Sequence, residues 1–217
     1  MCRMGRQFLG IALSAVIGLG ATAWSAAPST PLLPPPDRAS LVFVGSSIFH
    51  RWTNLAASMA PLAVVNRAFD GAQTTDMLRV LDAVLSGDSP RVVVYYCGSN
   101  DVSAGQPATA IFERIREFFT RARTARPEMR LVFVSIIRAP EKQDRWQVVD
   151  EVNHRVEAFA IDTKQLQYVD VNPVLFNRDG TPKAELYLSD QLHFRPAAYD
   201  ELARTLKPVL THAFGPP

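Results

Sequence analysis

The sequence contains few of the side chains that build metal sites or disulfide frameworks. It has two cysteines, Cys2 and Cys97, and four histidines, none of which lies in an HExxH pattern. A dedicated metal centre therefore has no visible ligand set, and we expect no bound metal. Cys2 falls in an N-terminal segment typical of targeting signals, which excludes a disulfide with Cys97 in a mature protein. Cys97 ends an apolar run directly before Gly98, which favours a buried structural thiol over a catalytic one.

The chain also lacks an excess of charge of either sign. It carries 23 Lys and Arg residues against 21 Asp and Glu residues, and the charges are mixed along the sequence. Proteins that bind nucleic acid need a basic stripe or patch for the phosphate backbone. Because no dense Lys/Arg cluster is present, we expect no nucleic-acid partner.

The N-terminus reads as an export signal. Arg3 and Arg6 precede the apolar run FLGIALSAVIGLGATAW, no acid intervenes, and small residues at 21–23 suit signal peptidase. We expect a signal peptide over residues 1–23, a Pro-rich linker over 24–39, and a periplasmic or secreted protein. An uncleaved inner-membrane anchor is the alternative, because an apolar run of about 17 residues is at the short limit for crossing a bilayer.

Residues 40–214 read as one α/β domain. Five β-rich apolar runs alternate with segments that have helical spacing of apolar residues; the runs are LVFVG, LAVVN, VVVYYC, LVFVSI and LQYVDV. Continuous apolar runs are typical of strands buried on both faces of a parallel sheet. Right-handed crossovers between such strands predict a three-layer α/β/α sandwich with a five-stranded parallel sheet in the flavodoxin-like order 2-1-3-4-5.

A sheet of this order binds ligands where the strand order reverses, between its first and third strands. The segments that follow those strands are GSSIF, with Ser46 and Ser47, and CGSND, with Asn100. Taken alone, either serine could be a helix N-cap and GSND could be an ordinary turn. Their predicted convergence favours a functional site.

Two further stretches could complete such a site. In LYLSDQLHFRP, Asp190 and His193 lie three residues apart just before a helix that begins at Pro196, which predicts an acid and base pair. A structural turn is the alternative for this pair taken alone. In NRAFDGAQ, Gly71 allows the backbone after the second strand to approach a ligand closely, or it is a plain turn glycine.

Together these stretches resemble the SGNH (GDSL-like) hydrolase superfamily over residues 41–210. The blocks that carry the resemblance are FVGSSIFHRW, NRAFDGAQ, GSND and SDQLHF. The sequence is most similar to a bacterial branch written GSSSIRLW, with which Trp52 also agrees. It departs from the GDSL signature at Ser46, where Asp is commonest, and from that branch at Ala68 and Asp70, where glycines are common.

The resemblance implies a Ser-His-Asp triad and an oxyanion hole. Ser47 would be the nucleophile, His193 the general base and Asp190 the group that orients His193. The oxyanion hole would consist of the Ser47 N–H, the Gly71 N–H and the Asn100 side chain. This chemistry needs no cofactor.

We therefore expect a serine-dependent hydrolase of carboxylic esters that acts on a small-molecule ester such as an acylated sugar, a lipid or a small alcohol ester. A compact chain with Trp52, Arg138 and Trp146 near predicted crevice loops favours a short acyl or acetyl group, with Trp52 contacting the substrate. The alternatives are a lysophospholipase or thioesterase, and a non-catalytic cell-envelope module that binds carbohydrate or lipid. The sequence specifies no oligomeric state.

Overall fold

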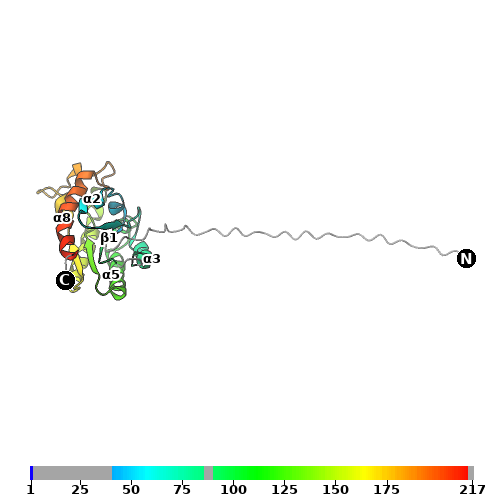
Figure 1. Ribbon diagram of the computed structural model, residues 1–217. Helices are drawn as coiled ribbons and strands as arrows, with labels where there is room; N and C mark the ends of the chain where they lie inside the picture. The colour runs from blue at the N-terminus through cyan, green and yellow to red at the C-terminus, as the bar shows by residue number, and fades with distance from the viewer. Residues whose placement is uncertain (2–40, 86–89, 215–217) are drawn as a thin grey trace. The chain divides into compact units, whose positions relative to one another are not determined.

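The computed structural model describes Met1 and residues 41–85 and 90–214 (Figure 1). The predicted signal peptide 1–23 and linker 24–39 lie outside the described residues, so export or anchoring stays a prediction. Among the helices of the described part, none combines the length and the apolar character that crossing a membrane requires.

The sheet has the predicted architecture. Five strands pair in parallel in the order β2-β1-β3-β4-β5, so the order reverses at β1 as expected. The strands are β1 (Leu41–Gly45), β2 (Val64–Asn66), β3 (Val92–Tyr96), β4 (Arg130–Val134) and β5 (Leu166–Val169). Every residue of β1 and β3 is buried, which explains why their sequences are continuously apolar.

Helices cover both faces of this sheet. The helices are α1 (Ser47–His50), α2 (Leu55–Met59), α3 (Thr74–Leu85), α4 (Ser99–Ser103), α5 (Ala108–Ala125), α6 (Trp146–Ile161), α7 (Asn172–Leu175) and α8 (Pro196–Phe214), with short 3-10 turns η1 (Pro140–Arg145) and η2 (Ala184–Leu186). In Figure 1, α2 and α8 lie on one side of β1, and α3 and α5 lie on the other.

Alternation along the strands divides the core into two clusters. Leu41 and Phe43 of β1 pack with residues of α1, α2 and α8, whereas Val42 and Val44 pack with residues of α3, α5 and α6. The three-layer sandwich follows from this alternation, because each face of the sheet is apolar and requires its own layer of helices.

The turn from β1 into α1 passes very close to the end of β3. Gly45 has φ +146°, a conformation that L side chains rarely adopt, and a Cβ built at this position would lie 1.8 Å from the carbonyl oxygen of Tyr96. The next residue, Ser46, donates its N–H to that same oxygen at 3.0 Å. Only glycine therefore fits at the residue that leads the chain from β1 to Ser47.

We expect Gly45→Ala to lower the free energy of unfolding by more than about 3 kcal/mol, because the methyl group meets backbone that cannot rotate away. The matched control is Gly180→Ala, since Gly180 has φ +83° but open space around its Cβ position. Conformational strain alone predicts a loss of about 1 kcal/mol for this control. Urea unfolding of both variants measures the difference, and equal losses would show that the contact with Tyr96 is not the cause.

Candidate active site

Four segments place the predicted site residues at the carboxyl edge of the sheet. Ser47 begins α1 directly after β1, Gly71 lies in the loop after β2, and Asn100 lies in α4 after β3. Asp190 and His193 lie in the loop between η2 and α8.

The side chains of Ser47, His193 and Asp190 lie in one hydrogen-bonded line. Ser47 Oγ is 3.0 Å from His193 Nε2, and His193 Nδ1 is 2.6 Å from Asp190 Oδ2. When Nδ1–H donates to the carboxylate, Nε2 is the unprotonated nitrogen and can accept the Ser47 hydroxyl proton. The fold thus brings the Ser47 hydroxyl to the imidazole of His193, which lies 146 residues later in the sequence, and to the carboxylate of Asp190.

The loop around Asp190 is shaped by its own carboxylate. Asp190 Oδ1 accepts hydrogen bonds from the backbone N–H of Leu192 at 3.0 Å and from that of His193 at 2.9 Å. Desolvation alone would raise the pKa of Asp190, but the hydrogen bonds from the His193 ring and from these two N–H groups lower it to about 2. The carboxylate therefore stays ionised where the imidazole needs an anionic partner.

This shift predicts a pH-dependent contribution to stability. A carboxylate whose pKa is lower in the folded chain than its unfolded value of about 3.9 stabilises the fold fully above about pH 5, and that contribution is lost as the pH falls towards 2. We expect Asp190→Asn to be less stable than wild type at pH 6. The difference between the urea midpoints of the two proteins should be smaller at pH 3 than at pH 6. Asp82→Asn serves as the control, because Asp82 has no hydrogen-bond or ion-pair partner within the described ranges. A gap that does not change with pH would contradict this account of Asp190.

The three groups expected to form an oxyanion hole each have a polar hydrogen without an acceptor among the described residues. No acceptor among the described residues pairs with the backbone N–H of Ser47 or of Gly71. Asn100 Nδ2 donates one hydrogen to the Ala72 carbonyl at 2.9 Å, which leaves its second amide hydrogen without an acceptor in the described part of the chain. Gly71 has φ +75° with nothing within 4 Å of a built Cβ, so its backbone conformation, rather than crowding, requires glycine.

A buried ion pair that the sequence did not reveal braces the same region. Asp101 is fully buried and accepts hydrogen bonds from the Thr74 N–H at 3.0 Å and the Thr74 hydroxyl at 2.6 Å. Arg114 of α5 completes the pair at 3.2 Å. Asp101 thereby joins α4 to the start of α3; in the sequence it reads only as the last residue of a polar GSND turn.

Cys97 is a buried structural thiol, as predicted. Its side chain is fully buried, its Sγ–H donates to the Ala72 carbonyl at 3.3 Å, and burial raises the pKa of the thiol well above its usual value. A neutral buried thiol is a poor nucleophile.

An exposed ion pair joins the end of α1 to the loop after β2. Arg51 Nε and Nη2 each donate to one carboxylate oxygen of Asp70 at 3.2 Å. Hydrogen bonding within the pair raises the pKa of Arg51 and lowers that of Asp70.

Trp52 does not have the substrate-contacting position expected from the sequence. It is 1% exposed and belongs to the core between the sheet and α8, where its ring packs against Phe43, Phe49 and Tyr199. Its size and apolar ring make this packing more favourable than exposure to solvent at a crevice. The prediction that Trp52 binds substrate was therefore wrong.

The other two residues suggested for the crevice are engaged with protein groups. Arg138 Nε donates to Asp150 at 2.6 Å, and its guanidinium lies 6.0 Å from the centre of the Phe176 ring. Trp146 donates its indole N–H to the Ala139 carbonyl and contacts the same Phe176 ring edge-on.

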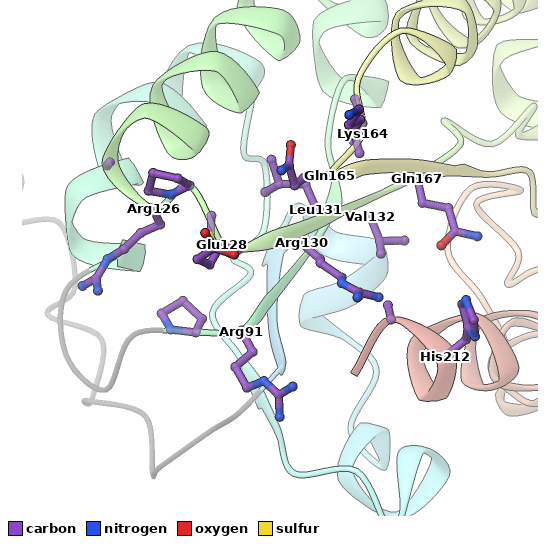
Figure 2. A pocket seen from close by; sticks show the side chains of 16 residues that line it. Arg91, Arg126, Glu128, Arg130, Leu131, Val132, Lys164, Gln165, Gln167 and His212 are labelled. Carbon is purple, nitrogen blue, oxygen red and sulfur yellow. The ribbon is translucent and has the colours of Figure 1, made fainter. Parts of the chain in front are cut away.

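A cavity of about 940 Å³ lies away from the triad residues, at the edge of the sheet where β3, β4 and β5 begin. Figure 2 shows the side chains of Arg91, Arg130 and His212 around it. Neither Ser47 nor His193 lines this cavity. Within the described residues, no three His, Cys, Asp or Glu side chains gather closely enough to hold a metal ion.

Comparison with known proteins shows which family the chain belongs to. The GDSL-like Lipase/Acylhydrolase family model matches residues 37–201. A GDSL-like lipase from Bacteroides thetaiotaomicron is 20% identical with a TM-score of 0.70, and the match covers 83% of this chain and 93% of that one.

Two other solved structures share the fold. A lipase/acylhydrolase from Enterococcus faecalis is 18% identical with a TM-score of 0.66, and the match covers 82% of this chain and 98% of that one. An acetyl esterase solved with an acetate ion is 15% identical with a TM-score of 0.62, covering 81% and 98%. A search of curated proteins returned no match.

Proposed function

Because this chain belongs to the GDSL-like lipase/acylhydrolase family, within the SGNH superfamily, and is an esterase-type hydrolase, we propose that Ser47, His193 and Asp190 form its catalytic triad and that its substrates carry short acyl groups. The observation that carries the proposal is the line of hydrogen bonds from Ser47 Oγ through His193 to Asp190. This arrangement matches the roles of nucleophile, base and orienting acid by geometry.

In the first half of the reaction, His193 Nε2 takes the proton of Ser47 as Oγ attacks the ester carbonyl. Asp190 holds the imidazole ring in place and stabilises its positive charge. The tetrahedral intermediate collapses, the alcohol leaves with the proton that His193 returns, and the acyl group remains on Ser47. Water then repeats these steps on the acyl-enzyme and releases the acid, so that the net reaction consumes one water and needs no cofactor.

The negative charge on the intermediate requires donors that are already in place. The N–H of Ser47, the N–H of Gly71 and the second amide hydrogen of Asn100 are the groups we assign to this oxyanion hole. Ser47 lies in α1 and Asn100 in α4, so little reorganisation of these two donors accompanies the reaction, which is the source of electrostatic stabilisation in such sites.

The adjacent serine, Ser46, has a different role. It occupies the N-cap position of α1 but makes no side-chain capping hydrogen bond, and its N–H is committed to the Tyr96 carbonyl. Ser46 is 1% exposed, whereas the hydroxyl of Ser47 contacts His193. We therefore assign Ser46 to the turn and Ser47 to the chemistry.

The preference for short acyl groups rests on the surroundings of the triad. A long acyl chain gains about 0.8 kcal/mol for each methylene only where an apolar channel removes it from water. Two cavities among the described residues lie elsewhere, one at the opposite edge of the sheet and one lined by residues of α2 and α8, and neither is lined by Ser47 or His193. The charged side chains of Arg51 and Asp70 also lie beside the triad loops.

A panel of p-nitrophenyl acetate, butyrate and octanoate tests this proposal. We expect kcat/KM for octanoate to be at least about tenfold below that for acetate, since the longer chain gains no buried contact. The Ser47→Ala variant provides the background rate for each ester. A rate that rises with chain length would favour a lysophospholipase or thioesterase instead.

A further inference from the structure

The loop that carries Gly71 is attached to the nucleophile helix on one side. Asn66 Nδ2 donates to the Phe49 carbonyl at 2.6 Å, and His50 Nδ1 lies 2.9 Å from the Ala68 carbonyl oxygen. The Phe69 N–H also donates to the Gly45 carbonyl at 3.0 Å, so these contacts fix the loop through residue 69 against the end of β1 and α1.

The same loop is attached to α4 on its other side. The Ala72 carbonyl accepts the Asn100 amide at 2.9 Å, and Thr74 is held through its N–H and its hydroxyl by Asp101. The chain is therefore fixed again from residue 72 onward. Asp70 and Gly71 lie between the two fixed parts.

Among the described residues, Arg51 supplies the only side-chain hydrogen bonds to this middle part. Gly71 has no side chain and no atom within 4 Å of a built Cβ, and Asp70 contacts Arg51 through both carboxylate oxygens. We propose that the Arg51–Asp70 pair is a clamp that orients the Gly71 N–H for the oxyanion; the inference rests on the proposed function.

The reason lies in the peptide unit that the two loop residues share. The Gly71 N–H belongs to the planar peptide between Asp70 and Gly71, so the direction of this N–H is set by how that plane is held. Glycine restrains the plane little from its own side. A two-point contact with the planar Arg51 guanidinium at the end of α1 restrains Asp70, and through it the peptide plane relative to Ser47.

A glycine at position 70 could not bind Arg51, so the restraint depends on the carboxylate that Asp70 supplies. Arg51 and Asp70 are thus positioning residues, because they act through Gly71 and not on the substrate itself.

Stability and catalysis can be separated at this pair. The side chains are 43% and 50% exposed, and exposed ion pairs contribute little to the stability of a fold. We expect Arg51→Gln and Asp70→Asn to leave the melting temperature within about 2 °C of wild type. A change in rate in these variants then reports orientation and not unfolding.

The test measures kcat and KM for p-nitrophenyl acetate in full-length Arg51→Gln, Asp70→Asn and the double variant. We expect each single change to lower kcat about tenfold, as partial misplacement of one oxyanion donor predicts, with KM within about twofold of wild type. The double variant should lose no more than either single variant, because a clamp missing one partner is already open. Arg155→Gln is the matched control: Arg155 pairs with Glu151 on α6 at similar exposure and should leave kcat unchanged.

Two results would overturn the clamp while the proposed function stands, provided that Ser47→Ala is inactive. One is a kcat equal to that of wild type in both single variants. The other is a double variant whose loss equals the product of the two single losses, which would show that the residues act independently. If wild type and Ser47→Ala instead hydrolyse the ester equally fast, the proposed function fails and the clamp fails with it.

Discussion

Replacing Ser47 or His193 with alanine is expected to lower kcat/KM for p-nitrophenyl acetate by at least about 10⁴-fold. Ser47 Oγ supplies the attacking atom and His193 Nε2, 3.0 Å away, receives its proton, so either change removes the covalent route. Because the two residues act as one unit, the double variant should be no slower than either single variant. Steady-state kinetics at neutral pH, corrected for the rate without enzyme, measures the effect.

The chain offers a matched control for each of these changes. Ser46→Ala removes a neighbouring hydroxyl that has no contact with His193, and His154→Ala removes an exposed imidazole of α6. Both should stay within about threefold of wild type, as is usual for residues outside the chemistry. A Ser46→Ala variant as inactive as Ser47→Ala would contradict the assignment of the nucleophile.

Asn100→Ala is expected to lower kcat by about 100- to 1000-fold with little change in KM, because an oxyanion donor acts mainly in the transition state. Its amide also holds the Ala72 carbonyl, so loss of that structural contact must be separated from loss of the donor. Cys97→Ala makes the separation, since the Cys97 thiol donates to the same carbonyl and is not part of the proposed oxyanion hole.

We expect Cys97→Ala to keep kcat within about threefold of wild type. Equal losses in Asn100→Ala and Cys97→Ala would show that both residues matter only through the Ala72 contact. Separate measurement of kcat and KM is essential, because a misfolded site would change KM as well.

Much of the fold could be predicted because its signals are local. Strands β1, β3 and β4 are largely buried and therefore read as continuous apolar runs, and the strand order follows from crossover handedness. The strand order alone places the segments with Ser47 and Asn100 side by side, whereas the meeting of Ser47 with Asp190 and His193 is what the resemblance to the SGNH superfamily implies.

Other features depend on contacts that no local pattern encodes. The apolar residues of IFHRWTNLAASM have the spacing of one helix over 48–59, but the chain forms α1 and α2 with a break between them, where Trp52 turns into the core. The pairing of Arg51 with Asp70 and of Asp101 with Arg114 joins residues from different elements. Such pairs become visible only when the loops are placed in space.

Chemical labelling can locate the nucleophile directly. Wild type and His193→Ala would be treated with a fluorophosphonate, and the modified peptide would be mapped by tandem mass spectrometry. We expect one phosphonyl group on Ser47 in wild type and almost none in His193→Ala, because the serine is activated only by its base. A phosphonyl group on Ser46, or equal labelling of both proteins, would contradict this expectation.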